Sequence, residues 1–382
     1  MSYQQEKERV TPRVTRREFF LIAIALLTTS LFSCLDLRNS NDNVSLFNLE
    51  KIKNLNVILP ERLPPNELIG INLNAPFLWR EVNSPEKIKK AIENAYQFKA
   101  RTIRVFINDD FEPKLGEYRY EVLEKIGRLA QEYPLQVDLF DAFSLFHSNK
   151  LNLVYGSFPL SSPYLGVDFF ADKSLEIFLK RVRRIISYLN HVPGIVAWSV
   201  ANELEVPHTE KEKAREILTG WYEEVIKTIR SLDPKRPILS GVADPTLLDE
   251  ERLKACGLTA NTIHLYPNPF KNLLKSYYQP KHKKILPLIC QEIGFPSRVL
   301  GVSFDFFYDK LLSRYLTNNL LSFFKIDEKK GLITPEITSI GVWRLSFEGD
   351  LHQDGFELIP KNIPLTIKTL HFWSEIVEKI LN

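Results

Sequence analysis

The chain has 382 residues, 44% of them hydrophobic and 25% charged, which is the composition of an ordinary globular protein with enough length for a large core. The formal net charge is only +3, and no basic stripe interleaved with exposed aromatic residues stands out, so the sequence does not favour a nucleic-acid partner. Length alone would allow two or three domains, although some single-domain architectures use this much chain.

The N-terminus has the pattern of an export signal. Arg16 and Arg17 precede an apolar run from Phe19 to Leu27, which is too short to span a membrane comfortably. The residues around the two arginines resemble a twin-arginine signal. We therefore predict that residues 1–34 form a signal peptide, with an uncleaved signal anchor as the alternative. In both cases the rest of the chain lies outside the cytoplasm.

The three cysteines indicate a lipid anchor rather than disulfides or a metal site. Leu31-Phe32-Ser33-Cys34 resembles a lipobox, and a lipid on Cys34 after cleavage would tether the protein to the membrane surface. The other two, Cys256 and Cys290, are too few for a disulfide framework. No spacing of Cys or His residues indicates a metal, so we predict none.

Short apolar runs alternate with long amphipathic segments from Leu68 onward. The apolar runs, predicted as strands, are 68–73, 102–107, 136–142, 194–202, 237–243, 261–266, 286–294 and 339–346. The amphipathic segments, predicted as helices, are 84–99, 118–133, 172–191, 209–232, 247–255, 269–278, 304–324 and 365–380. Such alternation predicts parallel strands joined by right-handed crossovers, and about eight repeats fit a closed barrel. The predicted fold is α/β, a (β/α)8 TIM barrel over residues 66–382, preceded by a linker at 35–65 that is rich in Asn, Ser and Pro.

The predicted strand ends carry no signature of a cofactor. The first strand is followed by Asn74-Ala75-Pro76-Phe77 rather than by a glycine-rich phosphate loop, which disfavours a dinucleotide. Strand-end lysines for Schiff-base chemistry are also missing, as is a glycine-rich phosphate site near the last strands, which argues against a barrel isomerase or aldolase. We therefore predict that the protein uses no cofactor.

Two carboxylates end two strands on opposite sides of the predicted barrel. The fourth strand runs directly into Asn202-Glu203, and the seventh runs into Gln291-Glu292. The carboxyl-terminal ends of the strands form the catalytic face of such a barrel, so the two side chains can face each other across one bond. A glycosidase needs this arrangement, because one carboxylic acid protonates the leaving oxygen while the other carboxylate attacks or stabilises the sugar. A single glutamate at a strand end could be a structural ion-pair partner, but an opposed pair is harder to explain in that way.

The segment Ala197-Trp198-Ser199-Val200-Ala201-Asn202-Glu203 resembles the Asn-Glu motif of clan A glycoside hydrolases, most closely the family-five cellulases and mannanases. The resemblance extends over nearly all of residues 68–373. It implies a retaining enzyme that cleaves β-linked oligosaccharides or polysaccharides, with Glu203 as acid/base and Glu292 as nucleophile.

The resemblance also implies roles for five further residues. Asn202 would hold the sugar 2-hydroxyl, and Arg104 would pair with the nucleophile. In the strand-six pair His264 and Tyr266, the tyrosine hydroxyl would support the nucleophile. Trp343 would form the floor of the glycone subsite. Each also has a structural interpretation: Arg104 as an interior ion-pair partner, His264 as a hydrogen-bonded core histidine, Trp343 as core packing.

The sequence departs from the family-five pattern in two places. The usual histidine at the end of strand three is missing, with Asp141 or His147 as candidate substitutes, and Leu204 stands where proline is frequent after the acid/base. These departures bear on the substrate and on the family within the clan. The aromatic-rich segment 143–170 is predicted to form a loop over the cleft.

A retaining pair needs its nucleophile ionised while its acid holds a proton, so the surroundings must push the two pKa values apart. We expect Arg104 and the Tyr266 hydroxyl to favour the charged form of Glu292, and the charge of Glu292 to raise the pKa of Glu203. Two alternatives stay open: a transglycosylase that uses the same site, and a non-catalytic carbohydrate-binding barrel. The sequence does not indicate an oligomeric state, the sugar or the linkage.

Overall fold

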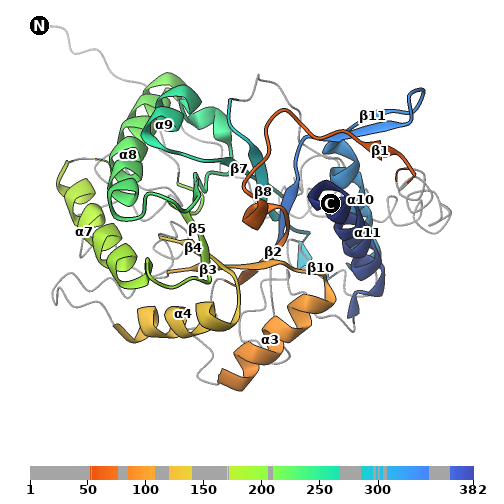
Figure 1. Cartoon of the computed structure of the whole chain (residues 1–382), viewed down its shortest axis with the longest axis horizontal. Coiled ribbons are helices and arrows are strands. Elements are labelled where there is room, and N and C mark those ends of the chain that lie inside the picture. Colours follow the sequence, from red (N-terminus) through yellow and green to blue (C-terminus); the bar gives the residue numbers. More distant parts are fainter. Residues whose placement is uncertain are drawn as a thin grey trace, which may run out of the picture.

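Figure 1 shows a computed structural model of the whole chain. The structure describes residues 52, 54–75, 85–107, 120–139, 170, 172–204, 210–266, 285–295, 298–299, 302–303, 308–343 and 362–382. The predicted leader with Cys34, the predicted helix at 269–278, Asp141, His147 and nearly all of the predicted loop at 143–170 lie outside these residues. Within them, no helix combines the length and the apolar character that crossing a membrane requires.

Eight parallel strands form the central sheet of the molecule. They are β2 (Gly70–Ala75), β3 (Thr102–Phe106), β4 (Leu135–Asp138), β5 (Ile195–Ser199), β6 (Ile238–Leu239), β7 (Asn261–Leu265), β8 (Leu288–Ile293) and β13 (Ser339–Val342). Their order is β6-β5-β4-β3-β2-β13-β8-β7, and every neighbouring pair is parallel. An isolated parallel bridge between Leu239 and Ala260 joins the two ends of this order. The predicted (β/α)8 barrel is therefore confirmed.

Side chains reinforce the junction between β6 and β7. The Thr262 amide donates to Ser240 Oγ at 3.1 Å, the two hydroxyls lie 3.2 Å apart, and Thr262 Oγ1 donates to the Val242 carbonyl at 2.8 Å. Ser240 and Thr262 are both fully buried. Hydroxyl groups thus supplement the short backbone ladder at this junction.

Helices surround the sheet, as Figure 1 shows. They are α3 (Pro85–Gln97), α4 (Tyr120–Glu132), α7 (Asp172–Leu189), α8 (Lys211–Leu232), α9 (Glu250–Cys256), α10 (Tyr308–Ser322) and α11 (Pro364–Leu381), with short 3-10 turns at η1 (Asn66–Leu68) and η3 (Pro245–Leu247). The seven helices match predicted segments to within a few residues. Because helices cover the outside and side chains fill the inside, strands such as β3 and β8 are buried along their whole length.

An ion pair between Asp233 and Arg236 fastens the amino-terminal end of the barrel. Arg236 donates to Asp233 Oδ2 at 2.6 Å, to the Ile195 carbonyl at 2.5 Å and to the Val192 carbonyl at 2.7 Å. The indole of Trp198 donates to the same Asp233 oxygen at 2.9 Å. The turn that enters β6 is therefore tied to the turn that enters β5.

Part of the predicted linker belongs to a small second sheet. β1 (Asn56–Val57) pairs in parallel with β12 (Leu332–Pro335), which pairs antiparallel with β11 (Phe324–Asp327). Ile52 is only 5% exposed and belongs to the main core. The folded part therefore begins before residue 66, because apolar side chains inside the range 35–65 are packed against the barrel. A two-stranded hairpin of β9 (Arg298–Val299) and β10 (Val302–Ser303) was also not predicted.

Candidate active site

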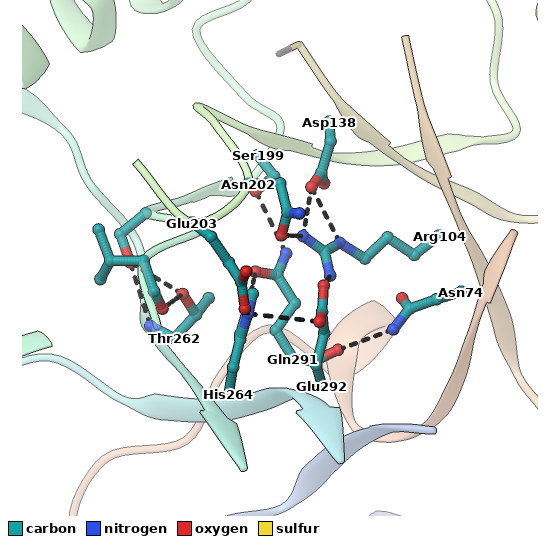
Figure 2. A network of polar contacts seen from close by, with 12 residues as sticks. Asn74, Arg104, Asp138, Ser199, Asn202, Glu203, Thr262, His264, Gln291 and Glu292 are labelled. Carbon is teal, nitrogen blue, oxygen red and sulfur yellow. Dashed lines mark hydrogen bonds and ion pairs between the residues drawn. The ribbon is translucent and has the colours of Figure 1, made fainter. Parts of the chain in front are cut away.

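The two predicted catalytic carboxylates meet at one imidazole (Figure 2). Glu203 follows β5, and Glu292 lies near the end of β8. Nδ1 of His264 lies 2.7 Å from Glu203 Oε1 and 3.4 Å from Glu292 Oε2. One nitrogen of His264 and one carboxylate oxygen of each glutamate all lie within 4.8 Å of one another. The barrel thus brings together residues that are far apart in the sequence, at the carboxyl-terminal ends of its strands.

An unusual backbone conformation presents Glu203. Its φ is 52°, in the left-handed region that residues with a side chain seldom adopt, and its amide donates to the Gly241 carbonyl at 2.9 Å. Gly241 also has a positive φ, of 75°, and a Cβ there would lie 1.5 Å from the carbonyl oxygen of Ala201. A glycine at 241 therefore lets the end of β6 approach the end of β5 and hold Glu203 in place.

Glu292 is almost fully buried and has donors on both carboxylate oxygens. Arg104 Nη1 donates to Oε1 at 2.5 Å, and the Tyr266 hydroxyl donates to Oε2. The exposed fraction of the Glu292 side chain is 2%, against 22% for Glu203. Both contacts that the sequence predicted for Glu292 are present.

Arg104 also has a second carboxylate partner that the sequence analysis did not identify. Its Nε donates to Asp138 Oδ2 at 3.0 Å and its Nη2 donates to the same oxygen. Nη2 donates in addition to Asn202 Oδ1 at 3.0 Å. Arg104 and Asp138 are both wholly buried, so two acidic partners share the interior guanidinium.

A further set of buried polar side chains lies beneath the pair and was also not predicted. Gln291 Nε2 donates to Ser199 Oγ at 3.2 Å, and Gln291 Oε1 lies 3.4 Å from His264 Nε2. The Asn74 amide donates to the Gln291 carbonyl at 3.3 Å. The available signal was their presence in otherwise apolar strands, since a buried polar side chain needs a partner.

Trp343 lies beside this network and makes an aromatic contact. Its ring meets Phe106 edge-on with centroids 6.0 Å apart, and the Arg104 guanidinium lies over the Phe106 ring at 4.4 Å. Trp343 is partly buried and packs against the core. Leu204, which follows Glu203, is fully buried. The role of Trp343 under a sugar stays a prediction.

The surroundings separate the two carboxyl pKa values in the opposite order from our prediction. Burial raises the pKa of Glu292, and the opposing effects of His264, Arg104 and Tyr266 do not cancel that rise. Burial acts on Glu203 in the same direction, but the hydrogen bond and charge of His264 outweigh it and lower the pKa of Glu203. Glu292 is the more buried of the two, and the imidazole lies closer to Glu203.

The pKa of His264 completes this picture. Burial lowers it, but the charges of Glu292 and Glu203 and the hydrogen bond to Glu203 raise it above its ordinary value. In the free protein the proton of the cluster is therefore drawn toward His264. Glu203, His264 and Glu292 are also close enough to hold a metal ion, but Arg104 and Tyr266 already donate to the oxygens of Glu292.

No protein-family model matches the sequence, and no curated protein matches it. Solved structures match in fold. An endo-1,4-beta-D-mannanase from Thermotoga petrophila RKU-1 is 18% identical, with 80% of this chain and 99% of that chain covered and a TM-score of 0.55. A glycoside hydrolase family 5 mannosidase from Rhizomucor miehei is 12% identical, with 82% of this chain and 95% of that chain covered and a TM-score of 0.55.

A third similar structure is a lactosyl-enzyme intermediate of endo-glycoceramidase II from Rhodococcus sp.. It is 14% identical, with 81% of this chain and 80% of that chain covered and a TM-score of 0.51. Sequence identities this low establish a shared fold only. The activity has to be argued from the residues of the site. The chain has the (β/α)8 barrel fold of the clan A glycoside hydrolases, the fold of these mannanases, mannosidases and glycoceramidases.

Proposed function

We propose that the protein is a retaining β-glycosidase with Glu203 as acid/base and Glu292 as nucleophile. The observation that carries the proposal is the approach of the two carboxylates, whose facing oxygens lie within 4.8 Å of each other and of one imidazole nitrogen. Retaining enzymes hold their carboxyl groups about 5–5.5 Å apart, whereas inverting enzymes leave about 6.5–9.5 Å for a water molecule. The short separation supports retention.

The reaction has two steps. In the first, a Glu292 oxygen attacks the anomeric carbon and forms an ester, while the bond to the leaving oxygen breaks and its electron pair stays on that oxygen. Glu203 gives its proton to the leaving oxygen. In the second step water attacks the anomeric carbon, gives a proton to Glu203, and the ester bond returns its electrons to Glu292. Both glutamates are regenerated, and the sugar keeps its configuration.

The surrounding side chains suit these steps. Arg104 and Tyr266 hold both oxygens of Glu292 and so orient the nucleophile. The Asn202 amide oxygen faces Arg104, which turns the amide nitrogen to the other side, where it can donate to a sugar hydroxyl. The greater exposure of Glu203 suits a group that must reach the leaving oxygen and, later, water.

For the substrate we propose a β-linked oligosaccharide or polysaccharide, with β-mannan and β-glucan as the first classes to test. The similar structures include enzymes described as mannanase and mannosidase, which motivates the order of testing. We also propose that the protein is exported and tethered to a membrane surface through Cys34, on the strength of its leader.

The test is an assay of the protein without residues 1–34 on aryl β-glycosides, soluble β-mannans and soluble β-glucans. We expect hydrolysis of at least one class, with a first-formed product that keeps the β configuration by NMR. Glu292→Ala, prepared in parallel, is the control for contaminating activity. An inverted first product would contradict the mechanism, and no turnover on any class would contradict the proposed function. Products longer than the substrate would reveal transglycosylation.

A further inference from the structure

The polar contacts beneath the catalytic pair have a definite direction, which begins at Arg104. A guanidinium can only donate hydrogen bonds, so Asp138 accepts at Oδ2 from Nε and Nη2. Burial raises the pKa of Asp138, whereas the charge of Arg104 and its hydrogen bonds lower it. The Ser199 hydroxyl lies next in this set of contacts, 3.2 Å from the Gln291 amide.

The two neighbours of Gln291, Ser199 and His264, define the orientation of its amide. The amide nitrogen of Gln291 donates to Ser199 Oγ, 3.2 Å away. The amide oxygen of Gln291 therefore faces His264 Nε2, 3.4 Å away. An amide oxygen can only accept, so Nε2 of His264 carries a proton. Figure 2 shows Gln291 between the serine and the histidine.

The other nitrogen of His264 then has a different task. Nδ1 faces Glu203 at 2.7 Å and Glu292 at 3.4 Å. With Nε2 already protonated, Nδ1 either accepts the proton of a Glu203 carboxylic acid or donates to a Glu203 carboxylate as part of an imidazolium. In both forms one proton is shared between Nδ1 and Glu203.

We propose that Gln291 is a positioning residue that holds His264 with a proton on Nε2, so that Nδ1 and Glu203 share the proton delivered in catalysis. This inference rests on the proposed function. The opposite tautomer, with the proton on Nδ1, would donate to a Glu203 carboxylate while the imidazole stayed neutral. The pair would then lack the proton that the leaving group needs.

The charges around His264 agree with a shared proton. Glu203, Glu292 and Arg104 all act on its titration, and it in turn acts on Asp138. The two carboxylates raise the pKa of His264 against its burial, and His264 lowers the pKa of Glu203 against its burial. These two directions agree with one proton shared between His264 Nδ1 and Glu203.

The direct test is 15N NMR of histidine-labelled protein across a pH series. The chain has 7 histidines, so the His264 signals are identified by their loss in His264→Gln. We expect Nε2 to be of the protonated type at every pH at which the protein is folded, with changes confined to Nδ1. A neutral ring with its proton on Nδ1 would overturn the proposal. This measurement needs no turnover, so it stands even if no glycoside is hydrolysed.

The kinetic test compares Gln291→Met with Gln291→Glu. Methionine removes the acceptor at Nε2, so His264 can donate from Nδ1 to a Glu203 carboxylate, and the basic limb of kcat/KM should move down by about one pH unit. The loss at neutral pH should be about tenfold on poor leaving groups and small on activated aryl glycosides. Glutamate keeps an acceptor oxygen at Nε2, and its negative charge can only raise the pKa of His264, so the basic limb should stay in place or move up.

Gln136→Met is the matched control, because Gln136 is also a fully buried glutamine on a barrel strand, but its side chain makes no hydrogen bond to the catalytic pair within the described residues. It should leave the pH profile unchanged. A Gln291→Met profile that coincides with the Gln136→Met profile would overturn the positioning role. If Gln291→Met fails to fold, the NMR spectrum of the wild-type protein decides alone.

Discussion

Glu203 combines a strained backbone with a side chain that must be aimed accurately. A residue other than glycine in the left-handed region costs on the order of 1–3 kcal/mol and persists when its surroundings hold it there. Here the amide bond to Gly241 and the imidazole of His264 hold the two ends of Glu203. The cost of this backbone conformation fits a residue that is held for the direction of its side chain and not for its contribution to stability.

Glu203→Ala should separate substrates by their need for a proton. Turnover of glycosides with poor leaving groups should fall by about 10²–10⁴-fold, while activated aryl glycosides should lose much less in glycosyl transfer to Glu292. Added azide should restore turnover and yield a β-glycosyl azide, since a small anion can enter the space left by the carboxylate. Equal losses on both kinds of substrate, without rescue by azide, would show that Glu203 has a structural role.

Glu292 should become covalently labelled. A 2-fluoro sugar with a good leaving group traps the ester, and mass spectrometry of peptides should find the sugar on Glu292. Glu292→Ala should abolish turnover on all substrates, because neither a better leaving group nor a stronger acid replaces the nucleophile. A label on another carboxylate would contradict the assignment.

The sequence identified the two carboxylates of the candidate site and their direct partners better than the residues that surround them. Glu203 and Glu292 stand out because each ends an apolar strand, and Arg104, His264 and Tyr266 followed from a resemblance. Asp138, Ser199 and Gln291 follow no spacing rule, since their roles arise only where separate strands converge inside the barrel. The pKa order was mispredicted for the same reason: the distance from His264 to each carboxylate is a property of the folded barrel.

At the scale of elements, the contact between β5 and β6 determines where Glu203 lies. Gly241→Ala would place a methyl group against the Ala201 carbonyl, so one of the two strand ends must move. We expect a loss of about 2 kcal/mol or more in the free energy of unfolding, together with a marked loss of activity. Thermal unfolding and kcat/KM measure the two effects.

Gly331→Ala is the matched control for that substitution. Gly331 has a φ of 65°, close to the 75° of Gly241, but nothing lies within 4 Å of the position of its added Cβ. It should therefore show the conformational cost alone, about 1–2 kcal/mol, with normal activity. If the two variants behave alike, the close approach at Gly241 is not what positions Glu203.

The Asp233–Arg236 pair should make stability depend on acid pH. Burial raises the pKa of Asp233, but hydrogen bonds from Arg236 and Trp198 outweigh it and hold the pKa below its ordinary value. A lowered pKa stabilises the fold above the unfolded-state value and loses that effect as the pH falls through the folded-state value. Asp233→Asn should therefore cost about 1–3 kcal/mol at neutral pH.

The deficit of Asp233→Asn should shrink as the pH falls below about 4, the ordinary pKa of an aspartate. Denaturant unfolding across pH 2–7 measures it. Asp327→Asn serves as a control, because the Asp327 side chain is 44% exposed and pairs with an exposed lysine. A deficit that is constant with pH would contradict the charge-based account.

The elements that belong to the barrel were predictable, whereas the small sheet was not. Each barrel strand is a continuous apolar run between amphipathic helices, and that contrast survives in the sequence. β1 is only two residues long and carries exposed Ile58 and Leu59 just after it, so no alternation marks it. Its pairing with β12 joins residues far apart in the chain, which a local pattern cannot reveal.

At the scale of the whole molecule, one barrel accounts for a length that would otherwise suggest two or three domains. The N-terminal region has its own prediction. If the leader is cleaved before Cys34, mass spectrometry of the protein from its native host should find Cys34 as the first residue, carrying lipid. Cys34→Ser should leave the protein unlipidated and free of the membrane. A mature chain that still begins at Met1 would contradict export by cleavage.

The junction between β6 and β7 divides the candidate site into two halves. Glu203 belongs to the β5–β6 side, and His264 and Glu292 belong to the β7–β8 side. An isolated bridge, a few backbone hydrogen bonds and the hydroxyls of Ser240 and Thr262 join the sides, which is a weaker connection than a full strand ladder. On heating, this junction would open before the rest of the barrel, and the acid would part from its imidazole while both halves stayed folded. The upper working temperature of the protein would then be set by a few residues at one seam, and it could evolve without any change in the core.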